Sequence, residues 1–219
     1  MIKLLLADDQ ELVREGFRAI LQAEPDIDVV GVASEGAEAV ELARTVRPDV
    51  VLMDIRMPGV DGIEATRRLA RLVDPPRVLI LTTFDLDEYV YEALRAGAGG
   101  FLLKAVPRDQ LVGGIRIVAR GEALLAPALT RRLIERYVRR PAPDDAAARA
   151  LGELTAREEE VLRLVARGHS NAALAAELFL SEATVKTHIA HILTKLNLRD
   201  RVQLVVFAYE TGFVEPGVS

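Results

Sequence analysis

The sequence contains no cysteine among its 219 residues, so neither disulfide bonds nor thiolate chemistry are available to it. No apolar stretch approaches the roughly 20 residues that a membrane-spanning helix needs. The N-terminus also lacks the basic region and apolar core of a signal peptide. We therefore expect a cytoplasmic protein with no membrane association.

The sequence also lacks a strongly basic segment. Its formal net charge is −5, residues 1–120 carry a net charge of −5 and residues 151–219 carry −2. Any contact with nucleic acid must therefore depend on a local patch. The hydrophobic fraction of 50% excludes global disorder, and the length predicts one or two domains with cores of their own.

Four short apolar runs in the first half of the chain each end in a polar residue. Continuous apolar runs are typical of parallel strands that are buried on both faces. In sheets of this kind, binding sites lie at the carboxyl ends of the strands. The residues that close the four runs are Asp8 with Asp9, Asp54, Thr82 and Lys104.

Short β patterns alternate with amphipathic helical patterns over residues 1–120. Strands are predicted at 2–7, 28–33, 49–54, 77–82 and 100–104, and helices at 11–23, 36–46, 62–72, 86–97 and 107–120. Five βα units predict an α/β fold with a doubly wound, five-stranded parallel sheet. Right-handed crossovers would then bring Asp8, Asp9 and Asp54 to one crevice.

Three carboxylates in one crevice repel each other unless a counter-charge is present, and Mg²⁺ prefers such oxygen ligands. Lys104 and the Thr82 hydroxyl are suited to bind phosphoryl oxygens, which makes Asp54 the candidate nucleophile for an aspartyl phosphate. The alternative is that these are solvated residues at strand ends. That alternative is favoured for Asp8 and Asp9 alone, but not for the complete set.

Residues 1–120 resemble the flavodoxin-like receiver domain of bacterial two-component systems. The resemblance rests on Asp8-Asp9, the stretch from Met53 to Gly62, Leu81-Thr82 and the stretch from Gly97 to Lys104. It implies phosphorylation of Asp54 by a sensor histidine kinase. It also implies Mg²⁺ (or Mn²⁺) bound by Asp9, Asp54 and the backbone carbonyl of Arg56, with Asp8 in support.

The same resemblance implies that Thr82 and Phe101 form a switch pair, in which the hydroxyl moves to the phosphoryl group and the aromatic ring turns inward. Phe101 lacks the phenol often found at this position. Ala105 stands where an acidic residue often follows the lysine, which is a departure from the family pattern beside the fifth strand.

Residues 121–150 differ in character from the domain before them. Residues 127–138 could form a short amphipathic helix, and the proline- and alanine-rich stretch 141–148 is typical of a mobile linker. We expect residues 121–150 to connect the receiver domain to a second domain at 151–219.

Residues 151–219 predict an all-α domain of four helices. Thr155 and Glu158 form a capping-box pattern before the first helix, and Ser170 and Ser181 are candidate caps of the second and third. A short helix, a tight turn and a longer helix form the helix-turn-helix arrangement. Its third helix offers the residues that we expect to bind DNA: Ser181, Thr184, Val185, Lys186, Thr187, His188, His191 and Lys195.

Two other interpretations of that helix remain open. It could be an ordinary solvated helix face, although the surrounding helix-turn-helix pattern favours contact with phosphates and base edges. His188 and His191 could hold a metal, but no third candidate ligand lies nearby in the sequence.

Residues 151–215 are similar to the LuxR-type helix-turn-helix domain, on the stretches 154–162, 168–171, 180–188, 192–196 and 199–201. With the receiver-like half, the chain resembles a response regulator of the NarL/FixJ type. This implies a phosphorylation-switched transcriptional regulator that binds double-stranded DNA as a homodimer and has no enzymatic role of its own. Ala172, Ala173 and Ala190 replace residues that are often polar or charged. We therefore expect binding to depend on pairing of two copies, for example through the last helix with Val202, Val205, Val206 and Tyr209.

Two further functions compete with this one. A Mg²⁺-dependent phosphohydrolase also uses a carboxylate nucleophile, but such enzymes place it in an Asp-x-Asp pattern after the first strand, and they leave residues 151–215 unexplained. The second competing function is that of a receiver-like domain that binds a ligand and is never phosphorylated. The complete set of pocket residues argues against this function.

Overall fold

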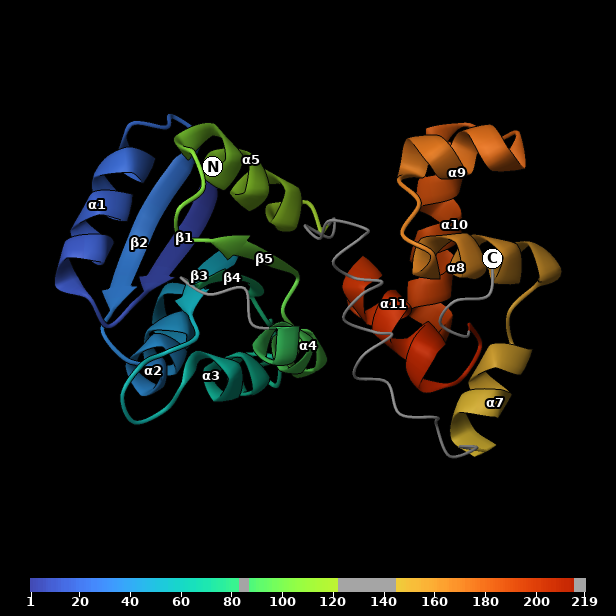
Figure 1. The fold of residues 1–219 in the computed structure, drawn as a ribbon, viewed down its shortest axis with the longest axis horizontal. Coiled ribbons are helices and arrows are strands. Elements are labelled where there is room, and N and C mark those ends of the chain that lie inside the picture. The colour runs from blue at the N-terminus through green and yellow to red at the C-terminus, as the bar shows by residue number, and fades with distance from the viewer. Residues whose placement is uncertain (83–86, 122–144, 215–219) are drawn as a thin grey trace. The chain divides into compact units, whose positions relative to one another are not determined.

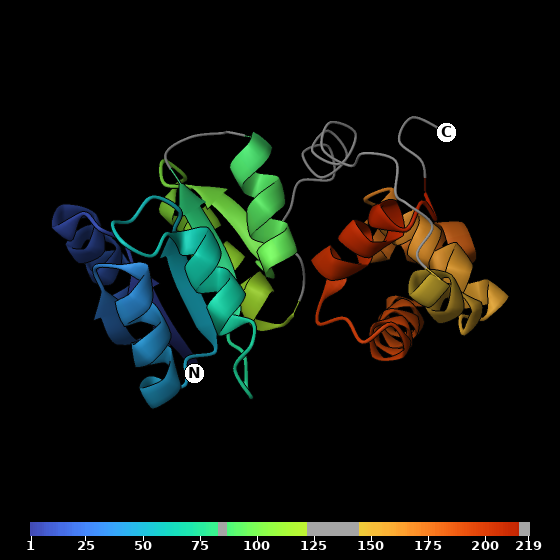
Figure 2. The same cartoon turned by 90° about the horizontal axis from the view of Figure 1, so that it is seen from below.

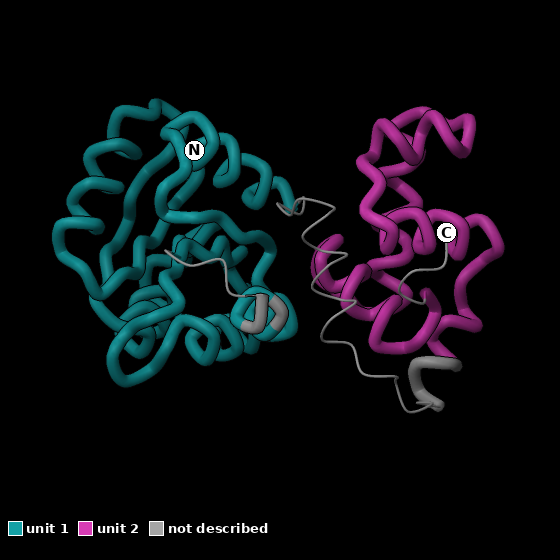
Figure 3. Tube along the Cα trace, in the orientation of Figure 1, with its two compact units in different colours: residues 1–124 teal, residues 125–219 magenta. Residues whose placement is uncertain are grey.

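The computed structural model in Figure 1 describes residues 1–82, 87–121 and 145–214. It divides the chain into two compact units, residues 1–124 and 125–219, which Figure 3 colours separately. None of the helices in the described ranges is both long and apolar enough to cross a membrane. The predicted short helix at 127–138 lies outside the described residues.

The first unit contains a five-stranded parallel sheet with the strand order β2-β1-β3-β4-β5. The sequence predicted this α/β fold class, and the structure confirms it. The strands are β1 (Ile2–Ala7), β2 (Ile27–Ala33), β3 (Val50–Asp54), β4 (Arg77–Thr82) and β5 (Gly100–Leu103). The helices are α1 (Glu11–Gln22), α2 (Gly36–Val46), α3 (Gly62–Leu69), α4 (Asp87–Ala96) and α5 (Arg108–Ala119).

Helices cover both faces of this sheet. Figure 1 shows α1 and α5 on one face and α2, α3 and α4 on the other, where Figure 2 shows these three side by side. All five residues of β3 are buried, which explains why its sequence is continuously apolar until Asp54. The strand order reverses beside β1, so the ends of β1 and β3 flank the switch point at which such sheets bind ligands.

Helix α3 ends at Leu69, three residues before the predicted end at 72. The amide groups of Arg71 and Leu72 donate to the carbonyls three residues earlier, Arg68 and Leu69, so the chain tightens into a turn. Pro75 and Pro76 then lead into β4.

The second unit consists of helices joined by short turns in its described residues. Its helices are α7 (Asp145–Gly152), α8 (Ala156–Ala166), α9 (Asn171–Leu178), α10 (Glu182–Lys195) and α11 (Arg201–Glu210). Apolar residues of α8, α9, α10 and α11 form one core, against which Ala150 and Leu151 of α7 pack. The four helices predicted over 151–215 are confirmed as α8 to α11.

Helix α7 corrects the prediction of a linker over residues 141–148, because the helix begins at Asp145. Alanine has the highest intrinsic helix propensity, so the run 146–148 favours a helix once Ala150 and Leu151 have a core to pack on. Residues 141–144 lie outside the described residues.

Serine and threonine side chains cap the helices of the second unit as the sequence predicted. Thr155 and Glu158 form a complete capping box at the start of α8. Ser170 caps α9, and the Ser181 hydroxyl accepts from the backbone amide of Thr184 to cap α10. These caps fix the two helix starts that define the helix-turn-helix.

Candidate functional site

Three aspartates meet at the carboxyl edge of the sheet. Asp8, Asp9 and Asp54 each place a carboxylate oxygen within 4.8 Å of the others. Asp8 and Asp54 are only 1% and 5% exposed, whereas Asp9 is exposed. The structure thus brings together the acidic residues that the strand ends predicted.

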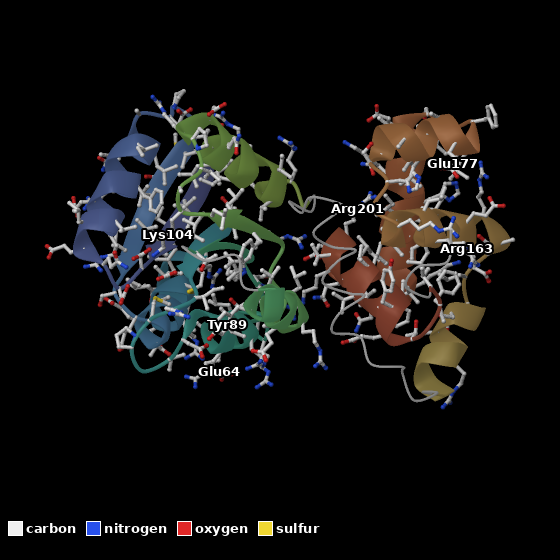
Figure 4. All side chains as sticks on the ribbon, viewed as in Figure 1. Glu64, Tyr89, Lys104, Arg163, Glu177 and Arg201 are labelled. Carbon is white, nitrogen blue, oxygen red and sulfur yellow. The ribbon has the colours of Figure 1, made fainter. Side chains whose placement is uncertain are left out.

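Lys104, which Figure 4 labels, directly follows β5 and provides the positive charge within this group. Its Nζ lies 2.6 Å from Oδ2 of Asp8 and 3.0 Å from Oδ2 of Asp54. Three carboxylates and one ammonium group leave the cluster with a formal charge of −2 when all are ionised. The cluster is therefore short of positive charge.

Burial raises the pKa of Asp54 above its usual value, although the ion pair with Lys104 opposes this effect. For Lys104, burial acts to lower the pKa. The contacts with Asp8 and Asp54 outweigh burial and raise it, so the ammonium group stays charged. The two pKa shifts show that the site is shielded from solvent and that Asp54 and Lys104 interact strongly with the charges around them.

The residues present fit a hard divalent cation. Oδ2 of Asp8 is buried and accepts no well-directed hydrogen bond, so its contact with the lysine is an ion pair alone. Oxygen ligands and an uncompensated negative charge are the conditions that Mg²⁺ requires. The structure supports the candidate ligands Asp8, Asp9 and Asp54 by their proximity.

A cavity of about 480 Å³ opens beside the cluster, with Asp9 on its wall. Arg56 follows β3 by two residues and lines this cavity, and its guanidinium group lies 5.7 Å from the centre of the Tyr89 ring. A cation over an aromatic face at this distance is attracted to the ring. The remaining lining residues are Ile55, Met57, Pro58, Asp61, Ile63 and Glu92.

Thr82 and Phe101 lie close to this edge of the sheet. Thr82 ends β4 and is buried, and its carbonyl accepts from the backbone amide of Lys104 at 2.7 Å. Phe101 is also buried and pairs with Ile80 in the sheet, so its ring already faces inward. The predicted switching movement of these two residues stays a prediction.

Two glycines allow the starts of α2 and α3 to pack closely at the site. A Cβ atom on Gly62 would lie 1.9 Å from the carbonyl oxygen of Asp54, and one on Gly36 would lie 2.3 Å from the carbonyl oxygen of Val60. Both distances are far inside van der Waals contact. Helix α3 can therefore start directly against Asp54, and α2 can start against the loop that carries Arg56, only because these positions lack a side chain.

Sequence reasoning missed Arg14. Its Nη1 atom donates to the backbone carbonyl of Asp8 at 2.7 Å, which holds the loop between β1 and α1. The Asp8 carboxylate in turn accepts from the amide of Gln10 at 3.0 Å. An arginine five residues after the acidic pair was the signal in the sequence, but only the fold shows that its side chain turns back towards Asp8.

In the second unit, most of the predicted DNA-binding residues lie on the exposed surface of α10 and its cap. These are Ser181, Thr184, Lys186, Thr187 and His191, and His188 is half-buried. Neither His188 nor His191 belongs to a group of three metal-ligating side chains in the described part of the chain. The metal site that the sequence left open there therefore gains no support.

Val185 and Lys195, two of the predicted DNA-binding residues, make contacts within the second unit. Val185 is 0% exposed and packs in the core, so its side chain is not available to DNA and this prediction was wrong. Lys195 donates to Oε2 of Glu158 at 2.7 Å and to the carbonyl of Glu153 at 3.0 Å. It joins the end of α10 to the start of α8, and its predicted contact with DNA stays a prediction.

Helix α11 is tied to the helix-turn-helix by Arg201, which Figure 4 labels. Its guanidinium group donates to the Asn171 side chain at 2.7 Å and to the carbonyl of His169. Val205 and Tyr209 of α11 are buried in the core of this unit, and the other two residues predicted to pair two copies are buried as well. Pairing of two copies through this helix stays a prediction. The C-terminal helix here stabilises the unit.

Comparison with known proteins gives matches over both units. The family described as "Response regulator receiver domain" matches residues 4–116, and the family described as "Bacterial regulatory proteins, luxR family" matches residues 152–208. The transcriptional regulatory protein YxjL of Bacillus subtilis is 45% identical over 215 residues, which are 98% of each chain. The transcriptional regulatory protein LiaR of the same organism is 42% identical, over 98% of this chain and 100% of its own.

Solved structures agree with these matches. The crystal structure of the response regulator ChrA, from a heme-sensing two-component system, is 40% identical with a TM-score of 0.52, over 97% of this chain and 98% of that one. The signal receiver domain of the response regulator NarL from Mycobacterium tuberculosis is 39% identical with a TM-score of 0.54, over 55% of this chain and 98% of its own.

Proposed function

The chain belongs to the bacterial response regulators that combine a receiver domain with a LuxR-type DNA-binding domain, and from this premise we propose that Asp54 is its phosphoacceptor. Phosphorylation switching is the general mechanism of the family. The observation that supports the assignment to Asp54 is its place in the cluster. It is the buried carboxylate that shares Lys104 with Asp8, 3.0 Å from the ammonium group, and it lies within 4.8 Å of Asp9.

In the proposed reaction, a carboxylate oxygen of Asp54 attacks the phosphorus of a phosphohistidine on a sensor kinase. The P–N bond breaks, and the leaving imidazole keeps the electron pair and takes up a proton from solvent. Lys104 offsets the charge of the transferred group, which adds about −1.5 to −2 to the pocket. The raised pKa of Lys104 supports this role, because the ammonium group is charged throughout the neutral range.

Asp9, Asp54 and the backbone carbonyl of Arg56 would hold Mg²⁺ or Mn²⁺, with Asp8 in support. The bound ion would neutralise carboxylate and phosphoryl charge together. Asp8 keeps Lys104 in place through the 2.6 Å ion pair, and Arg14 holds the Asp8 backbone. Each of these residues therefore orients another group in the site.

The DNA-binding half of the proposal rests on the exposed surface of α10. Lys186, Thr187 and His191 would contact phosphates and base edges in the major groove, with Ser181, Thr184 and His188 at its margin. Pairing of phosphorylated receivers into a homodimer would place two such helices on adjacent half-sites. The protein would have no substrate turnover beyond its own phosphotransfer and dephosphorylation.

The test of the phosphoacceptor is labelling with a small phosphodonor, such as acetyl phosphate, in the presence and absence of Mg²⁺. We expect labelling of the wild-type chain only with the metal, and none in Asp54→Asn. Asp28→Asn is a matched control, because it makes the same chemical change at an exposed position of β2. Labelling of Asp54→Asn at the wild-type level would refute the assignment.

Turnover of phosphate esters is measured on the same preparations. Catalytic release of phosphate from a small ester, at many equivalents per chain and lost in Asp54→Asn, would support the phosphohydrolase instead. We expect at most one equivalent of phosphate per chain in each phosphorylation cycle.

A further inference from the structure

Phe179 occupies an unfavourable backbone conformation in the turn of the helix-turn-helix. It is the C-cap residue of α9 and has φ 55° and ψ 45°, in the left-handed region. A side chain with a Cβ atom is strained there, and glycine or asparagine is the usual residue. At four other helix ends in the described ranges the residue with positive φ is glycine, namely Gly97, Gly121, Gly168 and Gly212, whereas α10 is followed by Asn197 and α2 ends on Arg47.

The side chain of Phe179 gains nothing from packing to offset this strain. It is 95% exposed, so its ring contributes no burial within the described structure. A glycine at this position would relax the backbone and leave every core contact in place. The reason for a phenylalanine therefore lies outside the fold of this unit.

The backbone that follows Phe179 is held at the start of α10 by hydrogen bonds. The amide of Leu180 donates to the carbonyl of Ala175 at 2.9 Å, and the Ser181 hydroxyl accepts from the amide of Thr184 at 3.1 Å. Two residues of chain span at most roughly 7 Å, so Phe179 is never farther than this from the cap of α10. The exposed side chains that follow the cap include Thr184, Lys186 and Thr187.

We propose that Phe179 is an apolar DNA contact, whose ring packs on the deoxyribose carbons and thymine methyl groups at the edge of the groove that α10 enters. This rests on the proposed DNA-binding function. Phenylalanine is among the side chains that contact the thymine methyl group. The neighbouring Glu182 is exposed and acidic, so it adds no attraction to phosphate beside the ring.

The test uses a DNA duplex selected from a random-sequence pool by the wild-type chain, titrated at several salt concentrations. Phe179→Gly removes the ring and relaxes the backbone. We expect its affinity for the duplex to fall about tenfold, with an unchanged slope of affinity against salt because no charge is lost. Its melting temperature should equal or exceed that of the wild type, which separates a lost contact from a damaged fold.

Lys186→Ala is measured beside it, and it should lose affinity with a salt slope that is smaller by about one. If Lys186→Ala loses affinity and Phe179→Gly does not, the inference about Phe179 is overturned and the DNA-binding function stands. If neither variant loses affinity, the proposed interface on α10 is wrong as well.

A second duplex with uracil in place of thymine identifies the part of DNA that the ring touches. Weaker binding of this duplex by the wild type, but not by Phe179→Gly, assigns the ring to thymine methyl groups. Equal binding of both duplexes by the wild type, with the loss in Phe179→Gly retained, assigns it to deoxyribose.

Discussion

The ion pair between Glu158 and Lys195 should decide how firmly α10 is held to α8. Glu158 is 4% exposed, and its Oε2 accepts from the Thr155 amide at 2.8 Å and from Nζ of Lys195 at 2.7 Å. Burial acts to raise the pKa of Glu158. The bonds from Lys195 and Thr155 outweigh burial and lower the pKa from 4.5 to about 2. The native state thus strongly favours the ionised carboxylate.

Lys195→Met keeps most of the side-chain volume and removes the charge. Breaking a fully buried pair costs about 3–5 kcal/mol, because the remaining charge has no partner. The Lys195 side chain is 33% exposed, so solvent screens part of the interaction and we expect a loss of about 1–3 kcal/mol. For a unit of this size, each kcal/mol corresponds to roughly 4–8 °C in melting temperature.

The assay is calorimetric unfolding of the full chain, with amide hydrogen exchange to assign the transition to the second unit. Lys195→Arg is the matched control and should retain most of the stability. Adding Glu158→Gln to Lys195→Met should restore part of the loss, since no buried charge then remains. A change below about 0.5 kcal/mol in Lys195→Met would refute the reasoning, because the pair would then behave as an ordinary surface ion pair.

The pH dependence has a defined sign. Because the folded pKa of Glu158 is depressed from 4.5 to about 2, its contribution is fully present above pH 4.5. The contribution is lost progressively as the pH falls from about 4.5 towards 2. Glu158→Gln should remove this part of the acid transition of the second unit, and an unchanged acid transition in Glu158→Gln would contradict it.

Three further predictions concern the receiver site and the core. Mg²⁺ should raise the melting temperature of the first unit, and Asp54→Asn should reduce this increase. Without metal, Asp54→Asn should melt at a higher temperature than the wild type, because the substitution removes a buried charge from a cluster of net charge −2. Calorimetry with and without Mg²⁺ tests both expectations. Gly36→Ala should slow labelling by a phosphodonor severalfold while the unit stays folded. The added Cβ atom would lie 2.3 Å from the carbonyl oxygen of Val60 and would displace the loop that carries Arg56. An unchanged labelling rate would show that this loop tolerates displacement. Val185→Ala should destabilise the second unit by about 1–3 kcal/mol, and Lys186→Ala by less than about 0.5 kcal/mol. The free energies of unfolding are measured by chemical denaturation. Equal losses in the two variants would contradict the placement of Val185 in the core and of Lys186 on the surface.

Local patterns determined much of the first unit. A strand that is buried on both faces must be apolar throughout, so the polar residues that end such runs mark the edge of the sheet. This is why the positions of Asp8, Asp54 and Lys104 along the chain are enough to assign them to one site. Parallel strands and right-handed crossovers leave few other places for them.

The same holds for the helix starts of the second unit. Thr155, Ser170 and Ser181 cap helices through bonds to amides within three residues, and interactions of such short range are visible in the sequence. The order of short helix, turn and longer helix follows from them.

The direction in which a side chain points within the fold was decided only by the tertiary structure. Val185 and Lys186 are neighbours on one helix, yet only the packing of α8, α9 and α11 determines that Val185 enters the core and Lys186 stays outside. Lys195 meets Glu158 across 37 residues of sequence, and Arg14 turns back to the Asp8 carbonyl. The beginning of α7 at Asp145 likewise depends on a core that its own residues do not supply. Contacts between elements depend on how the helices and the sheet pack in three dimensions. The periodicity of a sequence shows which face of a helix is apolar, but not which residues of another element pack against that face.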